Sequence, residues 1–405
     1  MSDGSHQGPI AAGIVTAVVG PSSSVVVVLA GLTAVGASPA QAASGLLTLL
    51  VTQGLGMLWL SLRHRTPIVL AWSTPGAALL ASMAALADGW PAAVAAFGVT
   101  GLLILLTALI PRLGRLVAAI PASLAQGMLA GVLVPLCLAP ATALAGAPLA
   151  VAPVVLTWLV LLPVSRRWAV PAALGVALVV VLLTGRDAIS GAGLVPAPVW
   201  TTPHLTVEGV IAVSVPLYVV TMASQNVPGV AVLASHGYRV PWRESLLVTG
   251  LGTMLGAPAG GHAINLAAIS AALAAGPDAG RDPRRRWIAA VTAGITMLVL
   301  AAASGALTTL VQAAPDGVMQ AAAGLALLGT LSGSLLAALT DSRDREAAVL
   351  TMLIAASGVA FLGIGAAFWA LAAGLLLRYV MRLTWPRRRA AVLTADDAAV
   401  PDLRA

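Results

Sequence analysis

The residues best suited to chemistry lie within an apolar run and mark the start of a helix. Ser73 is a good helix cap, and Thr74 and Pro75 follow in the first turn, where proline's missing N–H costs nothing. The preceding segment, 67–72, favours extended chain. We predict a short strand followed by a half-helix over 74–87, whose free N–H groups carry a partial positive charge.

A second interrupted stretch lies in the other half of the chain. Gly260 and Gly261 disfavour a helix, and we predict that one begins near His262, with Asn265 on the same face. The two helix starts would then face each other at mid-membrane and suit an anion without a buried cation. Neutral His262 would donate a hydrogen bond to that ligand. The alternative is that proline and glycine only kink these helices.

Further polar or aromatic residues interrupt apolar stretches. Gln225 and Asn226 are costly to bury without partners, so they either bind a ligand or pin one helix to another. Ser22 and Ser23 break the first apolar run and either face a ligand or bond to their own helix. Trp72 either stacks on an aromatic ligand or packs in the core.

The composition requires a membrane. Of 405 residues, 59% are hydrophobic and 9% are charged. Such a chain has too little polar surface for a soluble enzyme, a disordered protein or a nucleic-acid-binding module. The net charge of +7 comes from arginines clustered between apolar runs, so it does not imply nucleic acid. The lone Cys137 excludes an internal disulfide, and no motif predicts a metal, a cofactor or catalysis.

The apolar runs predict an all-α polytopic membrane protein with fourteen spans, each of about 20 residues. The spans are 10–33, 40–61, 67–87, 90–110, 117–139, 146–164, 168–185, 207–236, 241–256, 260–276, 287–304, 316–340, 346–361 and 363–382. With the N-terminus inside, every arginine except Arg186 falls on one side. We therefore predict that both termini are cytoplasmic and that 383–405 is a cytoplasmic tail.

The fourteen spans divide into two halves of seven. The Pro- and Gly-rich segment 186–206 separates them. An odd number of spans per half makes the halves antiparallel, as in the inverted repeats of secondary transporters. Pro121 and Gln126 in the fifth span recur as Pro315 and Gln320 in the twelfth. Spans 3 and 10, each predicted as a short strand plus a half-helix, are also equivalent members of the 7+7 repeat.

Several stretches resemble the bacterial benzoate membrane transport family of the BenE type. They are 67–81, 224–229, 261–271, 324–331 and 357–369, and the Ala-Trp-Ser-Thr-Pro-Gly run is quite specific. The resemblance covers nearly the whole chain. It implies a bacterial cytoplasmic (inner) membrane and a distant relationship to nucleobase–ascorbate and sulfate-type anion transporters.

The resemblance also implies how the spans are organised. Spans 1–4 and 8–11 would form a core domain, and spans 5–7 and 12–14 a gate domain; these are 10–110 with 207–304, and 117–185 with 316–382. The substrate would lie between the half-helices of spans 3 and 10. Nucleobase members carry an acidic residue where this chain has Gln225 and Asn226, which fits an anionic substrate. The distant relatives imply a homodimer.

Two functions remain open from the sequence. One is a secondary active transporter that imports benzoate or a similar aromatic carboxylate with protons by alternating access. The other is an exchanger or channel for another anion or a nucleobase-like substrate on the same fold. The expected partners are the carboxylate, protons and the lipid bilayer. The predicted substrate-binding residues are Ser22, Ser23, Trp72, Ser73, Thr74, Gln225, Asn226, Gly261, His262 and Asn265.

Overall fold

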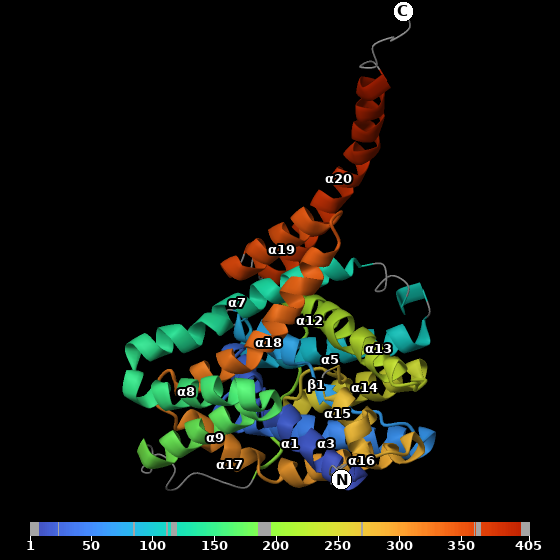
Figure 1. Cartoon of the computed structure of the whole chain (residues 1–405). Helices are drawn as coiled ribbons and strands as arrows, with labels where there is room; N and C mark the ends of the chain where they lie inside the picture. Colours follow the sequence, from blue (N-terminus) through green and yellow to red (C-terminus); the bar gives the residue numbers. More distant parts are fainter. Residues whose placement is uncertain are drawn as a thin grey trace, which may run out of the picture.

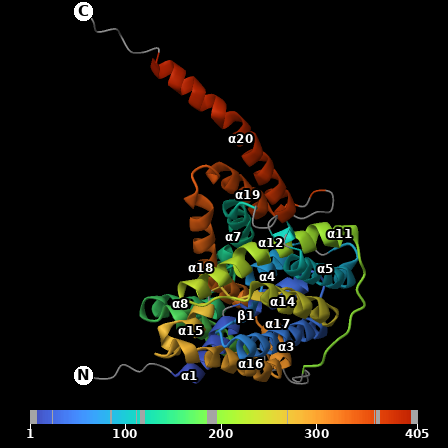
Figure 2. The same ribbon diagram turned by 90° about the vertical axis from the view of Figure 1, so that its right-hand side faces the viewer.

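The computed structural model describes residues 8–22, 24–83, 86–110, 112–114, 120–184, 196–268, 270–359, 361 and 366–397, with side chains to residue 382. Its first half contains α1 (Pro9–Ser22), α2 (Val25–Ala34), α3 (Pro39–His64), β1 (Leu70–Trp72), α4 (Thr74–Ala81), α5 (Gly89–Leu109), α7 (Ala122–Gly146), α8 (Pro148–Val164) and α9 (Arg166–Thr184). Helices surround β1 in both views of the molecule (Figures 1 and 2).

The second half also contains one short strand among its helices. It contains α11 (Val207–Gly209), the π-helix η1 (Val210–Ser214), α12 (Val215–Thr221), the π-helix η2 (Met222–Asn226), α13 (Val227–Ser235), α14 (Trp242–Gly256), the 3-10 helix η3 (Ala257–Ala259), β2 (Ile264–Leu266), α15 (Ala271–Ala275), the 3-10 helices η4 (Pro277–Ala279) and η5 (Pro283–Arg285), α16 (Trp287–Ala301), α17 (Ser304–Gln312), α18 (Val318–Thr340), α19 (Arg345–Ser357) and α20 (Ala366–Asp397).

Each predicted span coincides with a helix, a run of helices, or a strand and a helix. In the described part of the chain, seven helical stretches are long and apolar enough to cross a membrane. A pair of helices bent by 60°, Pro283–Ala301 with Ser304–Gln312, gives an eighth candidate. The predicted start of the fifth span, Arg186 and the last eight residues of the tail lie outside the described residues.

Several boundaries differ from the prediction. The half-helix α4 ends at Ala81 instead of residue 87, because the Ser82 N–H bonds back to two carbonyls and closes the last turn. Helix α17 occupies a predicted linker and buries Ser304 and Thr308, which lie on one face at a spacing of i, i+4. Helix α20 does not end at residue 382, since the following arginines, alanines and leucine favour helix, and it projects from the body (Figures 1 and 2).

The strands β1 and β2 form an antiparallel pair in the interior. The paired residues are Leu70 with Leu266, Ala71 with Asn265, and Trp72 with Ile264. The ladder continues by one backbone hydrogen bond at each end, from Ser73 to the Ala263 carbonyl and from Ala267 to the Val69 carbonyl. Extended backbone away from water needs such pairing, because lipid offers no hydrogen-bond partner.

The prediction that the second half-helix begins near His262 is wrong. Gly260 ends η3 with a positive φ of 89°, β2 then pairs with β1, and α15 begins only at Ala271. A helix starting at His262 would have left the backbone groups of β1 without their partners. Both interrupted spans therefore have the same order, a strand first and a short helix second.

Several helix crossings depend on glycine, and two of them join helices of the strand pair's surroundings. Where α5 packs against α14, a Cβ on Gly101 would lie 2.5 Å from the backbone nitrogen of Met254. Where α3 packs against α16, a Cβ on Gly54 would lie 2.9 Å from the Gly294 oxygen. Such close backbone approach between small residues is typical of membrane helices. Each crossing joins a helix of the first half to a helix of the second half.

Other helix contacts also occur in matched pairs. Helix α8 packs against α9, and α19 packs against α20. Helix α7 packs against α19, and α18 packs against α8. Helices α7 and α18 pack against each other. These six helices form one group, which we call the outer group. The remaining helices surround the strand pair, and we call them the strand group.

Candidate functional site

A cavity of about 450 Å³ lies between the strand group and the outer group. On the strand side it is lined by the break between α1 and α2, by β1, the start of α4, η2 and the chain after β2; on the other side it is lined by α8, α9 and α18. Its volume falls within the ~300–1,000 Å³ range of small-molecule sites. Most of the lining is apolar, and no described lining residue is Asp, Glu or His.

The start of α4 offers donors to this cavity through one residue. Ser73 is buried, and its Oγ is occupied, accepting from the Gly76 N–H at 3.1 Å and from the Thr221 hydroxyl at 2.8 Å. Thr74 lines the cavity, and neither its hydroxyl nor its backbone N–H bonds to a described residue. Ser73 therefore positions the helix start, while Thr74 remains available to a ligand.

The Trp72 side chain lines the cavity and is held in place by a hydrogen bond. It is only 3% exposed, and its indole N–H donates to Ser24 Oγ at 2.9 Å. Ser24 lies in the turn between α1 and α2. The bond joins β1 to the break in the first span, so the indole has both a packing role and a place in the cavity wall.

Gln225 and Asn226 are neighbours in η2 but have different surroundings. The sequence left two roles open for them, ligand binding and pinning of one helix to another. Asn226 is fully buried, and its Oδ1 accepts from the Leu266 N–H at 2.9 Å, which pins β2 to η2. Gln225 lines the cavity, and its amide makes no hydrogen bond to a described residue. The π-helical turn that presents them is a rare conformation found frequently at functional sites.

The predicted residues around β2 lie away from the cavity lining. Asn265 is fully buried; in the orientation that satisfies both amide atoms, its nitrogen is 2.8 Å from the Leu266 oxygen and its oxygen 3.0 Å from the Ser73 nitrogen. Gly261 packs on the backbone of Gly256, where a Cβ would lie 3.3 Å from the carbonyl oxygen. These two residues hold the strand pair in place.

Ser22 of the first span is also separate from the main cavity. Ser22 Oγ donates to the Val19 carbonyl at 3.2 Å, within its own helix, and Ser22 lines a second cavity of about 10 Å³. Ser23 lies outside the described residues.

His262 is fully buried beside Phe97, with ring centroids 6.3 Å apart in an edge-on arrangement. Neither ring nitrogen has a hydrogen-bond partner among the described residues. His262→Leu is expected to stabilise the fold by about 1–3 kcal/mol, because a buried polar group without a partner is costly. The unfolding midpoint in detergent measures this, together with uptake of labelled benzoate, which should persist.

Asn226→Leu is the matched control for this substitution. It places the same apolar side chain at another fully buried position but leaves the Leu266 N–H unpaired, so it should destabilise the protein. If His262→Leu folds normally yet abolishes uptake, His262 contacts the substrate in some state of the protein.

The sequence did not predict the wall formed by the outer group. Trp158, Arg166 and Arg167 line the cavity from α8 and α9, and Thr330 lines it from α18. From the sequence, Arg166 and Arg167 contribute only to the prediction of topology. One clue was present, since α9 opens with two cations where the helix dipole favours an anion. The sequence alone, however, does not tell which helix faces the cavity.

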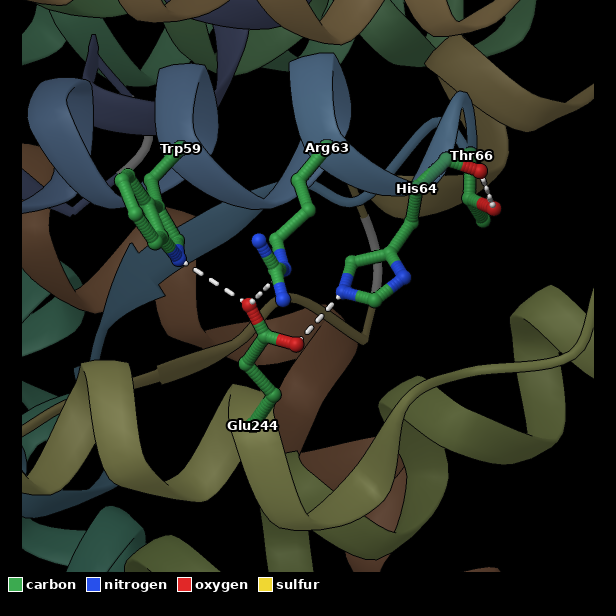
Figure 3. A network of polar contacts seen from close by, with 5 residues as sticks. All are labelled: Trp59, Arg63, His64, Thr66 and Glu244. Atoms are coloured by element: carbon green, nitrogen blue, oxygen red, sulfur yellow. Dashed lines mark hydrogen bonds and ion pairs between the residues drawn. The ribbon is translucent and has the colours of Figure 1, made fainter.

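A second polar cluster joins α3 to α14 and does not line the cavity (Figure 3). Glu244 accepts from the Trp59 indole N–H at 3.0 Å and contacts Arg63 Nε at 3.0 Å and His64 Nε2 at 2.7 Å. An acidic residue is favourable in the first turn of α14, but such exposed pairs contribute only about 0–1 kcal/mol. No described group of three or more His, Cys, Asp or Glu side chains could hold a metal ion.

A bundle of apolar helices around a buried strand pair, with a ligand-sized cavity between two helix groups, is an arrangement that suits a membrane transporter. The sequence model of the BenE family, described as "Benzoate membrane transport protein", matches residues 4–380. The chain therefore belongs to the BenE family of benzoate membrane transport proteins, which is a family of transporters and not of enzymes.

Two curated relatives cover most of the chain. It is 37% identical over 380 residues to "Inner membrane protein YdcO" of Escherichia coli (strain K12), covering 93% of this chain and 97% of that protein. It is 28% identical over 330 residues to "Benzoate membrane transport protein" of Acinetobacter baylyi (strain ATCC 33305 / BD413 / ADP1), covering 80% and 82%.

Solved structures share the fold. The transmembrane domain of the cyanobacterial bicarbonate transporter BicA matches with a TM-score of 0.60 at 15% identity, over 91% of this chain and 97% of that one. The murine anion transporter Slc26a9 in its inward-facing state matches with a TM-score of 0.64 at 13% identity, over 93% and 68%. At these identities the likeness establishes the architecture alone.

Proposed function

We propose that the protein imports benzoate or a similar aromatic carboxylate together with protons by alternating access. The cavity is the observation that carries this proposal, because an apolar chamber with a few donors at one helix start suits a ring with one charged end. Family membership supports the substrate class, and the Acinetobacter baylyi relative is named for benzoate.

In the proposed binding mode, the carboxylate meets the start of α4. The Thr74 hydroxyl and backbone N–H donate to it, with the Gln225 amide as a further donor. The positive end of the α4 dipole favours the anion. The ring packs against Trp158 of α8 and Leu325 of α18, which line the opposite wall. The substrate would thus contact both groups of helices at once.

We propose fourteen crossings arranged as two inverted halves of seven. The strand register supports this, because Ala71 and Asn265 are paired and their separation in sequence equals that of Pro121 and Pro315. A two-fold axis through the Ala71–Asn265 pair would relate the halves. The matched helix contacts and glycine crossings support the same symmetry.

We propose that the strand group is the core and that the outer group is the gate. The core, 10–110 and 207–304, would carry both helix starts, and the gate, 117–185 and 316–382, would supply the facing wall. Relative movement of the two would open the site to each side in turn. The proposal places the protein in the bacterial inner membrane as a homodimer, with both termini cytoplasmic.

The route of the proton is constrained by the lining. Since no described lining residue is Asp, Glu or His, a proton that accompanies the substrate travels on the carboxyl group itself or on a side chain behind the cavity wall.

Uptake into liposomes tests the proposal. Purified protein under an inward proton gradient should accumulate labelled benzoate above the level of protein-free liposomes, which control for diffusion of the neutral acid. Unlabelled benzoate should compete, whereas sulfate and uracil should not. Thr74→Ala should weaken this uptake through a higher KM. Absence of accumulation for any aromatic acid would refute the proposal.

The second candidate is an exchanger or channel for another anion or a nucleobase-like substrate. The free donors of Thr74 favour it, because they would donate equally well to an oxygen of another anion. Competition by sulfate, bicarbonate or uracil in the same liposomes, with no effect of benzoate, would establish this alternative.

A further inference from the structure

Arg166 and Arg167 are the only charged residues among the described residues that line the cavity. Both begin α9, and both are exposed. Neither forms an ion pair or a side-chain hydrogen bond with a described residue, in contrast to Arg63, Arg286 and Arg378. Their charges are therefore not neutralised within the described structure.

The surroundings of the pair increase its effect on an anion. Two cations in the first turn of α9 stand at the positive end of the helix dipole, where a cation is unfavourable. No acidic side chain in the described lining offsets them. The apolar walls have a low dielectric constant, and clefts of this kind focus the field of like charges and raise the local concentration of the opposite ion.

We infer that Arg166 and Arg167 form an entry site for the carboxylate at the mouth of the cavity, separate from the donors of Thr74. The inference rests on the proposed function and adds a second position for the same anion. Trp158 and Leu162 lie on one face of α8 and line the same cavity, so they offer the ring an apolar surface.

The entry site acts on one side of the membrane only. In the proposed topology, α9 begins at the cytoplasmic face, so the pair captures substrate from the cytoplasm. Rebinding there favours exchange and slows net import as substrate accumulates inside. Arg166 and Arg167 are thus positioning residues for the cytoplasmic half of the cycle, and binding from outside does not use them.

Vesicles of known orientation test the inference. Inside-out and right-side-out membrane vesicles containing the full chain are compared for initial rates of labelled benzoate uptake, at low and high ionic strength. Arg166→Gln with Arg167→Gln should raise KM at the cytoplasmic face by roughly three- to tenfold at low salt, with kcat unchanged. High salt should remove the difference, because it screens exposed charges.

Two further pairs of substitutions distinguish local capture of the carboxylate from a general effect of surface charge on KM. Arg284→Gln with Arg285→Gln removes the same charge from exposed residues that do not line the cavity, and KM should stay unchanged. Arg166→Lys with Arg167→Lys should restore KM, since attraction needs charge more than geometry.

Three results would overturn the entry site: an unchanged KM, an equal rise at both faces, or an equal rise in the Arg284 and Arg285 control. Failure of the wild type to carry benzoate would refute the proposed function instead. The same comparison with labelled bicarbonate or sulfate would then still decide whether the arginine pair captures an anion.

Discussion

Gly101→Ala is expected to destabilise the folded protein by about 1–3 kcal/mol. The added Cβ would lie 2.5 Å from the Met254 nitrogen and 2.8 Å from the Gly250 oxygen, both of which belong to the backbone of α14. A backbone cannot rotate out of the way as a side chain can, so α5 and α14 must move apart. The unfolding midpoint of the purified protein in detergent measures the loss.

Gly98→Ala is the control on the same helix. Its Cβ would meet only the Ala257 Cβ, at an ordinary contact distance of 3.8 Å. Since alanine favours a helix over glycine, this variant should be unchanged or more stable by about 0.5–1 kcal/mol. The two substitutions should therefore shift the midpoint in opposite directions. Equal shifts would mean that α5 and α14 leave room for a Cβ at Gly101.

Ser73→Ala is expected to cost about 2–4 kcal/mol and to reduce transport. The hydroxyl accepts from the Gly76 N–H as the cap of α4 and also from the buried Thr221 hydroxyl. Alanine would remove the cap and leave the Thr221 donor unsatisfied, and the two costs add. Because Thr74 follows directly, loss of the cap should also displace the donors proposed to bind the carboxylate.

Thr221→Val isolates the capping contribution. Valine keeps the shape of threonine and removes one donor, while Ser73 still caps α4 through Gly76. This variant should lose only about 1 kcal/mol and keep its benzoate KM. A Ser73→Ala protein with normal stability but weaker benzoate binding would show instead that Ser73 contacts the substrate directly.

Local sequence patterns were sufficient for much of the fold. The strand before α4 and the start of that helix at Thr74 follow from the capping hydroxyl and from proline in the first turn. The long helices follow from apolar runs of membrane length. In each case the signal and its structural consequence lie within a few residues of each other.

The remaining features depend on partners far away in sequence. β2 is extended because β1 pairs with it, and nothing around His262 encodes that register. Asn226 faces β2 while its neighbour Gln225 faces the cavity, a difference set by how the helix is placed between the two and not by residue type. Arg166 belongs to the cavity wall only because α9 folds against the strand group.

Because β1 pairs with β2, the first strand cannot form its final hydrogen bonds until the second has been synthesised. β1 leaves the ribosome long before β2, and at about 5–20 residues per second the interval to its partner is about 10–40 s. During that time its peptide groups lack their final partners, and each group left unpaired in hydrocarbon costs several kcal/mol. The nascent first half must therefore wait in a sheltered, hydrated setting, such as the insertion machinery, until the second half arrives to complete it.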